Sequence, residues 1–81
     1  MKVMNCDEEL DVKGLVCPMP ALKAKAHLMK MSAGKVLKVI TDYKPASESV
    51  PRDLAKTKHK LLGIEHNEDD GEWYIYFQCQ K

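Results

Sequence analysis

The stretch from Asp11 to Pro20 reads Asp-Val-Lys-Gly-Leu-Val-Cys-Pro-Met-Pro and joins an alternating segment to a helical one. Pro18 and Pro20 lack a backbone N–H, which costs little in the first turn of a helix because those donors have no intrahelical partner. The two prolines therefore predict that a helix begins here. Cys17 then precedes the helix directly, beside the positive end of the helix dipole.

The segments around this junction predict a strand before it and a helix after it. Residues 8–12 alternate polar and apolar side chains, as a short half-buried strand does. Residues 18–31 carry apolar side chains at helical spacing, and Gly34 follows as a C-terminal cap. The predicted core stripe of this helix is Leu22, Ala26 and Met29, with Ala21 and Leu28 beside them. Residues 35–42 are mostly apolar and β-branched and predict a second strand.

A second helix is predicted in the middle of the chain. Proline is tolerated only in the first turn of a helix, so Pro51 predicts a start near Ser49, after a loop over residues 43–46. We expect Gly63 to end this helix. Its predicted core stripe is Val50, Leu54, Leu61 and Leu62.

The end of the chain predicts a hairpin. Residues 64–68 and 72–79 have the pattern of strands, and Asp69-Asp70-Gly71 forms the turn between them. Because side chains alternate along a strand, one face of the last strand carries Trp73, Ile75, Phe77 and Cys79. The other face, which we expect the helices to leave open, carries Tyr74, Tyr76 and Gln78.

The resulting order is βαβαββ, and it predicts an α/β (α+β) two-layer sandwich. Two helices cannot cover both faces of a four-stranded sheet in 81 residues, so both helices should lie on one face. The first two strands should be parallel and the final hairpin antiparallel, which makes the four-stranded sheet mixed. We expect a single domain over residues 1–81, with residues 1–7 as a flexible N-terminal segment.

Composition excludes several classes of protein. Hydrophobic residues make up 44% of the chain and charged residues 31%, which suits a globular domain rather than a disordered chain. The net charge of +1 is too small for a dedicated nucleic-acid binder. The first residues form no apolar signal core, and no apolar run approaches the roughly 18 residues of a membrane span. We therefore expect a cytoplasmic protein without strong direct binding to nucleic acid or membrane.

The cysteines indicate thiol chemistry rather than a disulfide framework or a metal site. Their number is odd, and Cys6, Cys17 and Cys79 form no Cys-x-x-Cys pair and no metal-ligand spacing with a histidine. We expect neither a bound metal nor a cofactor. Cys79 is predicted to be a buried, inert thiol, and Cys6 an incidental thiol of the N-terminal segment.

Cys17 is the candidate nucleophile. The thiolate is the reactive form of cysteine, and a helix N-terminus lowers the pKa of a thiol below its free value of about 8.5. Lys23 and His27, further along the same helix, add positive potential. No His–Asn or His–Asp set stands near Cys17, so we interpret it as a thiol that accepts and passes on a group. The alternative is a cysteine that serves as a small buried apolar residue.

The pattern Asp-x-x-Gly-Leu-x-Cys-Pro-x-Pro at residues 11–20 resembles the signature of the TusA/SirA-like family of small sulfur-carrier proteins. The likeness extends over residues 8–80 and includes the second strand and the Val50-Pro51 pair. Family members often carry Asp-Asp-Pro after the second strand, where this chain has Asp42-Tyr43-Lys44-Pro45. The resemblance implies a two-layer α/β sandwich with the same βαβαββ order.

The resemblance also implies a function as a persulfide carrier. Cys17 is then the residue that receives sulfane sulfur from a cysteine desulfurase or a rhodanese-like donor and relays it to an acceptor protein. Family members serve tRNA thiolation, cofactor synthesis or sulfur metabolism. Such a chain is a relay carrier with a reactive cysteine rather than an independent catalyst. We expect it to be a monomer, because it must dock with one protein after another.

Other residues near Cys17 are expected to support it or to contact partner proteins. The motif residues that support Cys17 are Asp11, Gly14, Pro18 and Pro20. The residues expected to contact partners are Met19, Lys23, His27 and Asp42. Asp42 belongs to this set because the carboxyl ends of parallel strands and the starts of the following helices lie at one edge of a sheet.

Two other classes of function remain open. One is a non-catalytic interaction or regulatory module, in which Cys17 is only the rigid apolar start of a helix. The other is a thiol-redox protein that pairs Cys17 with Cys6 or Cys79.

Overall fold

The structure is a computed structural model that describes residues 6–16 and 19–80. Cys17, Pro18 and most of the segment predicted to be flexible (residues 1–7) therefore lie outside the described residues. Six elements follow one another: β1 (Glu8–Asp11), α1 (Met19–Lys30), β2 (Val36–Thr41), α2 (Lys44–Leu54), β3 (Lys60–Asn67) and β4 (Glu72–Gln78).

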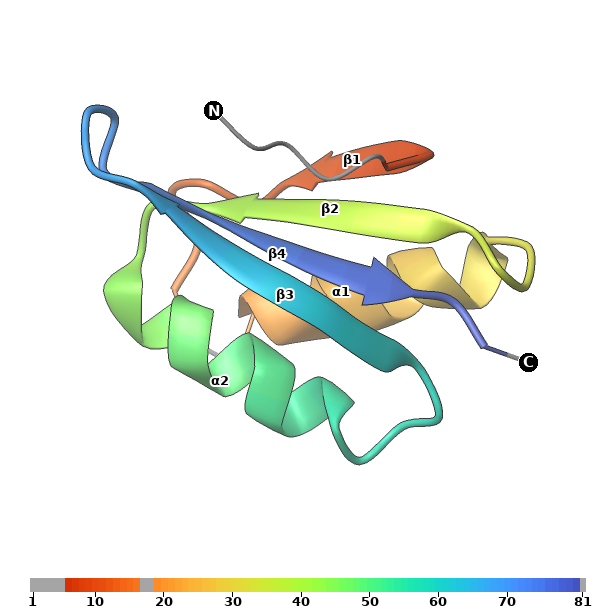
Figure 1. The fold of residues 1–81 in the computed structure, drawn as a ribbon. Coiled ribbons are helices and arrows are strands. Elements are labelled where there is room, and N and C mark those ends of the chain that lie inside the picture. The colour runs from red at the N-terminus through yellow and green to blue at the C-terminus, as the bar shows by residue number, and fades with distance from the viewer. Residues whose placement is uncertain (1–5, 17–18, 81) are drawn as a thin grey trace.

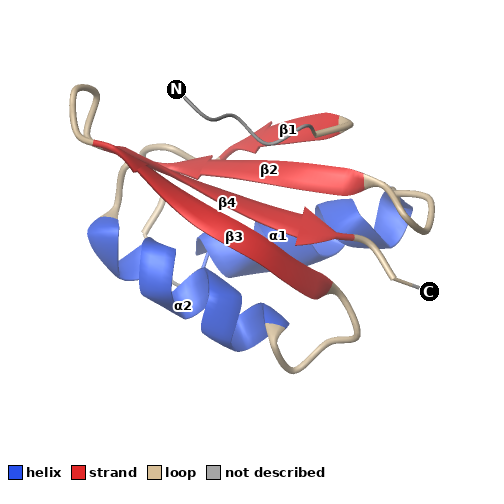
Figure 2. Ribbon diagram, viewed as in Figure 1, coloured by secondary structure: helices blue, strands red, loops and turns tan. Residues whose placement is uncertain are grey.

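The four strands form one mixed sheet, and both helices lie on the same face of it (Figures 1 and 2). The strand order is β1-β2-β4-β3. β1 and β2 are parallel, whereas β4 pairs antiparallel with both β2 and β3. The predicted βαβαββ order, the mixed sheet and the two-layer sandwich are therefore confirmed.

The core lies between the central strands and the helices. Leu37 pairs with Phe77, and Val39 pairs with Ile75, so four large apolar side chains of β2 and β4 point toward the helices. Cys79 is fully buried beside them, as predicted. The helices contribute the buried side chains of Ala21, Ala24, Leu28, Ala46, Val50 and Leu54. Because these groups form one cluster, they fix the helices against the sheet.

The predicted core stripe of α1 is wrong at Leu22, Ala26 and Met29, whereas Ala21 and Leu28, predicted beside it, are buried. Ala21, Ala24 and Leu28 are buried at i, i+3 and i+7, whereas Leu22 is 55% exposed and Met29 is 67% exposed. The helix carries a second apolar row, and helical spacing alone does not say which row faces the core. The buried row is the one that contains two small alanine side chains, Ala21 and Ala24.

The predicted start of α2 is also wrong. The helix begins at Lys44, and Pro45 rather than Pro51 occupies the first turn. Pro51 lies inside the helix, where it cannot donate a hydrogen bond to the carbonyl of Ser47, and the helix ends at Leu54. The chain then has room for a longer β3, which contains Leu61, Leu62 and Gly63 in place of the predicted helix end.

The face of β4 that points away from the helices is less open than predicted. Tyr74 is half-buried and Tyr76 is fully buried. The hydroxyl of Tyr76 donates a hydrogen bond to Oε1 of Glu65, at 2.8 Å. Burial, followed by this hydrogen bond, raises the pKa of Tyr76 above its ordinary value. On the other face of β4, Trp73 is only half-buried and stacks on the ring of His66, with 4.2 Å between ring centroids.

Two leucines of α1 test which face of the helix is packed. Replacing Leu28 by Ala should lower the free energy of unfolding by about 2–5 kcal/mol, because it leaves a cavity in the core. Leu22→Ala removes a side chain that is 55% exposed and should change the free energy of unfolding by less than about 0.5 kcal/mol. Urea unfolding of both variants measures these values. A larger loss for Leu22→Ala than for Leu28→Ala would mean that α1 packs through the other row.

Tyr76 makes stability depend on pH above the ordinary pKa of tyrosine. In the unfolded chain Tyr76 loses its proton near pH 10, whereas the raised pKa keeps it protonated in the folded chain. The unfolded state then binds fewer protons, so stability should fall as the pH rises past about 10. Tyr76→Phe lacks this group, and its melting temperature should decline less steeply over the same range. Parallel declines for the two proteins would contradict this assignment.

Candidate functional site

The candidate site lies at the edge of the sheet where β1 and β2 end. These strands are parallel, so Asp11 and Thr41, their last residues, reach the same edge. From there the chain enters the loop 12–16, which precedes Cys17, and the short connection 42–43, which precedes α2. The two connections are therefore neighbours in space.

Backbone hydrogen bonds hold the loop 12–16 against the end of the sheet. The N–H of Val12 donates to the carbonyl of Ile40, at 2.8 Å, which extends the pairing of β1 with β2 by one residue. The N–H of Leu15 donates back to the carbonyl of Val12, at 3.2 Å. The N–H of Lys13 donates to Oδ1 of Asp11, at 2.9 Å, and forms an Asx turn. The motif residue Asp11 thus shapes the loop.

Gly14 and Asp42 join the two connections. Gly14 has φ of +83°, a left-handed conformation that costs other residues free energy because their Cβ crowds the backbone. In this conformation its N–H donates to Oδ1 of Asp42, at 3.1 Å. The hydrogen bond ties the loop before Cys17 to the end of β2. Asp42, expected to contact partners, therefore has a partner within the chain.

A lysine and two carboxylates lie at the same edge. Nζ of Lys13 is 3.0 Å from Oε2 of Glu72 and 3.9 Å from Oδ2 of Asp11. The hydrogen bond with Glu72 raises the pKa of Lys13 above its ordinary value. The same bond, with a second one from the hydroxyl of Tyr74, lowers the pKa of Glu72. Lys13 and Asp11 are exposed to solvent and Glu72 is partly buried, so the ion pairs orient the loop more than they stabilise the fold.

α1 begins directly after Cys17 and Pro18. The N–H of Met19 donates to the carbonyl of Val16, at 2.9 Å. Pro20 is fully buried and anchors the first turn in the core. In contrast, Val16 is 57% exposed and Met19 is 41% exposed. The chain thus presents apolar, accessible side chains on both sides of the segment 17–18.

The charge on α1 is entirely positive. The helix contains no acidic residue, and its basic residues are Lys23, Lys25, His27 and Lys30. Lys23 is exposed and lies about one turn from Met19. The unpaired N–H groups of a helix N-terminus carry a partial positive charge. The start of α1 is therefore suited to an anion such as a thiolate.

His27 lies apart from the other predicted site residues. Its Nε2 is 2.7 Å from Oε1 of Glu8, at the start of β1 and hence at the other end of the sheet. It follows Met19 by eight residues, or about 12 Å along the helix axis. The predicted site residues that the structure brings together are Asp11, Gly14, Met19, Pro20 and Asp42, with Lys23 one turn further on.

Sequence reasoning missed Lys13 and Glu72. Glu72 is distant from the motif in sequence and reaches the site edge because β4 begins where β2 ends, with Trp73 opposite Thr41. The sequence feature that could have revealed Glu72 is the hairpin turn at residues 69–71, because it places the next residue at the edge where the parallel strands end.

Within residues 6–16 and 19–80 no group of His, Cys, Asp and Glu is arranged to hold a metal ion. No helix of that part of the chain is long and apolar enough to span a membrane.

The sequence of this chain is similar to that of several known proteins. The profile of the family described as sulfurtransferase TusA matches residues 8–78. A putative sulfur carrier protein of Archaeoglobus fulgidus is 36% identical over 72 residues, which cover 89% of this chain and 81% of the relative. A putative sulfur carrier protein of Thermotoga maritima is 39% identical over 71 residues, which cover 88% of this chain and 89% of the relative.

The fold is also found in a solved structure. The crystal structure of a SirA-like protein from Desulfitobacterium hafniense superimposes with a TM-score of 0.73. The match covers 93% of this chain and all of the other, at 23% sequence identity. The two proteins therefore share the two-layer sandwich.

The hydrogen bond between Gly14 and Asp42 can be tested by substitution at Asp42. Asp42→Ala removes the acceptor, so the amide hydrogen of Gly14 should exchange roughly two- to tenfold faster with solvent, as loss of one such bond allows. Asp42→Asn keeps a side-chain oxygen and should retain most of the protection. Hydrogen exchange followed by NMR measures both. Unchanged exchange in Asp42→Ala would show that this carboxylate does not hold the loop.

Proposed function

Since the chain belongs to the sulfurtransferase TusA family of sulfur carrier proteins, we propose that Cys17 carries the sulfur as a persulfide. The donor in this proposal is a cysteine desulfurase or a rhodanese-like protein, and the acceptor is a second protein. The observation that carries the proposal is the position of Cys17 in the chain. It stands between the exposed side chains of Val16 and Met19, at the positive end of a helix without acidic residues.

The proposed transfer conserves atoms and electrons. The thiolate of Cys17 attacks the outer sulfur of a persulfide on the donor cysteine. The bond between the two donor sulfurs breaks, a new S–S bond forms to Sγ of Cys17, and the donor cysteine leaves as a thiolate. Delivery repeats the exchange, with the acceptor cysteine as nucleophile and Cys17 as leaving group. No oxidant, reductant or cofactor is needed.

The surrounding residues have distinct roles in this proposal. The dipole of α1 stabilises the thiolate and the persulfide anion, while Pro18 and Pro20 stiffen the turn and donate no hydrogen bond. Asp11 and Gly14 shape the loop before Cys17. Met19, Lys23, His27 and Asp42 are the proposed contacts for partner proteins, and Asp42 also holds Gly14.

The proposal extends to cellular context. The chain acts in the cytoplasm as a monomer and delivers sulfur for tRNA thiolation, cofactor synthesis or sulfur metabolism. It is a relay carrier and not an independent catalyst. A thiol that accepts and passes on a group suits exchange between proteins, where each partner supplies its own cysteine.

The position of Cys79 argues against a redox protein. A disulfide needs two Cα atoms within about 7 Å. Cys79 is fully buried, and its Sγ lies 3.2 Å from the carbonyl of Leu28, nine residues beyond Met19. Nine residues correspond to about 13 Å of helix, so Cys79 lies near the end of α1 that is remote from Cys17.

Cys6 is also remote from the start of α1. It is followed by Asp7, whose N–H donates to the carbonyl of Val36 at the first residue of β2. Cys6 therefore lies at the end of the sheet opposite to the loop 12–16.

Mass spectrometry of the intact protein tests the proposal. After incubation with a cysteine desulfurase and L-cysteine, the wild type should gain one sulfur atom, which a thiol reductant removes. Cys6→Ser should gain the same sulfur, whereas Cys17→Ser should gain none. A wild type that stays unchanged, or a Cys17→Ser variant that still gains sulfur, would exclude Cys17 as the carrier. Loss of two hydrogens under mild oxidation would instead indicate a redox protein.

A further inference from the structure

α1 has an apolar row that the fold does not bury. We call Met19, Leu22, Ala26 and Met29 the outer strip, since they follow one another at i, i+3, i+7 and i+10 on the side opposite to the buried row. All four are exposed. The described chain exposes six large apolar side chains, and three of them lie on this strip, with Val16 as a fourth directly before it. Such a concentration marks a contact surface.

Positive charge borders the outer strip on both sides. Around the helix, Lys23 and Lys30 fall on one side of the strip and Lys25 on the other, by the 100° that each residue advances. All three lysines are exposed. None of them forms an ion pair with another described residue, because the ion pairs present involve Lys13, His27 and Lys38. Their charges are thus available to a partner.

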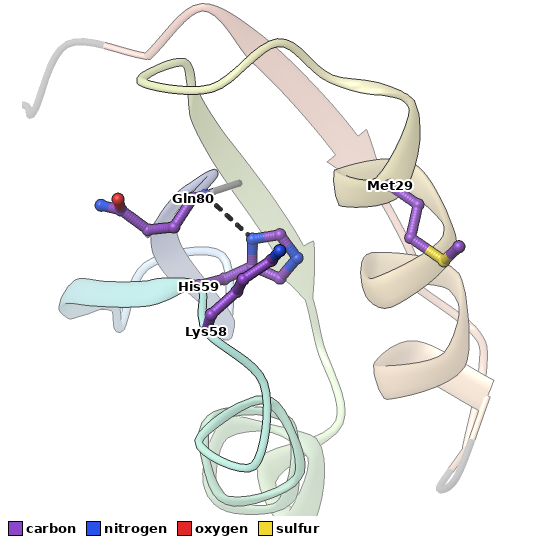
Figure 3. A pocket seen from close by; sticks show the side chains of 4 residues that line it. All are labelled: Met29, Lys58, His59 and Gln80. Atoms are coloured by element: carbon purple, nitrogen blue, oxygen red, sulfur yellow. Dashed lines mark hydrogen bonds between the residues drawn. The ribbon is translucent and has the colours of Figure 1, made fainter.

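The outer strip ends in a pocket. Met29, the last residue of the strip, lines a hollow of about 330 Å³ together with Lys58, His59 and Gln80 (Figure 3). The N–H of Gln80 donates to Nδ1 of His59, at 3.1 Å, which fixes the wall opposite Met29. The volume is near the lower limit of about 300 Å³ for small-molecule pockets. The hollow is wide open to solvent and could not enclose a free ligand, so it suits an apolar side chain that a partner surface holds in place.

We propose that the outer strip and this pocket form one docking surface for the sulfur donor. The matching surface of the donor is apolar and rimmed with carboxylates, and it places one apolar side chain between Met29 and His59, close to Lys58. This inference rests on the carrier function proposed above. The pocket lies about 15 Å along α1 from Met19, so contact there adds affinity and orientation and leaves the chemistry at Cys17 untouched.

Charge selects an acidic protein over other occupants. In a dimer through this strip, the lysines of one copy would face those of the other, and like charges in contact are unfavourable. A nucleic acid would use the lysines but gain nothing from Leu22 and Met29, because phosphate contacts dominate its affinity. A carboxylate-rimmed apolar protein surface matches both features of the strip.

The test separates docking from chemistry. A cysteine desulfurase with L-cysteine loads the carrier through a protein contact, whereas inorganic polysulfide loads Cys17 without one. Met29→Glu and Lys58→Glu should each raise the half-saturating carrier concentration with the desulfurase by about tenfold, with little change in the maximal rate. Both variants should load from polysulfide at the wild-type rate. Ile64→Glu places the same charge at a side chain that is 45% exposed on β3, outside this surface, and should match the wild type with both donors.

Each other outcome overturns the inference. Wild-type half-saturation in Met29→Glu and Lys58→Glu would show that the donor does not use the pocket. An equal effect of Ile64→Glu would show a response to charge anywhere on the protein. A wild-type dimer in sedimentation that Met29→Glu dissociates would assign the strip to a second copy. Failure of the carrier function looks different, because the wild type would then gain sulfur from neither desulfurase nor polysulfide.

Discussion

The rotation of α1 about its own axis is the constraint on which the rest of the structure depends. Ala21, Ala24 and Leu28 turn toward the sheet, and Pro20 is buried in the same layer. Burial of these side chains leaves Leu22 and Met29 in solvent. The helix therefore leaves an apolar row exposed along the side opposite to the sheet. A rotation by half a turn would bury that row and expose the alanines.

The edge of the sheet fixes the loop that leads into this helix. Parallel pairing brings the ends of β1 and β2 together, and the hydrogen bond from Gly14 to Asp42 joins the two connections. Lys13 adds a link to Glu72 of β4. The loop before Cys17 is thus held by backbone and side-chain contacts from three strands. A fixed loop is useful to a sulfur carrier, because successive partner proteins must then bind to one and the same loop geometry.

The sequence predicted the elements better than their orientation. Strand patterning identified β1 and β4, the β-branched apolar run identified β2, and the two prolines after Cys17 identified the start of α1. The buried face of α1 was missed because the helix is apolar on two sides, and the start of α2 because Pro45 and Pro51 both suit a first turn. Where two local patterns predict a structure equally well, tertiary packing decides which of them the fold adopts. Glu72 was missed because its place depends on the register of β4 against β2, which no local pattern contains.

Exposure of apolar side chains has a physical use in a relay protein. A carrier that bound each partner through a large dry interface would release it slowly, since affinity differences between related complexes appear mainly in the dissociation rate. Met19, Leu22 and Met29 instead offer a narrow row on one helix, with lysines that speed encounter with an acidic surface. In the proposed relay, the thiol of Cys17 directly precedes in sequence the helix that carries the proposed docking surface. The rigid helix would then set the distance between the two.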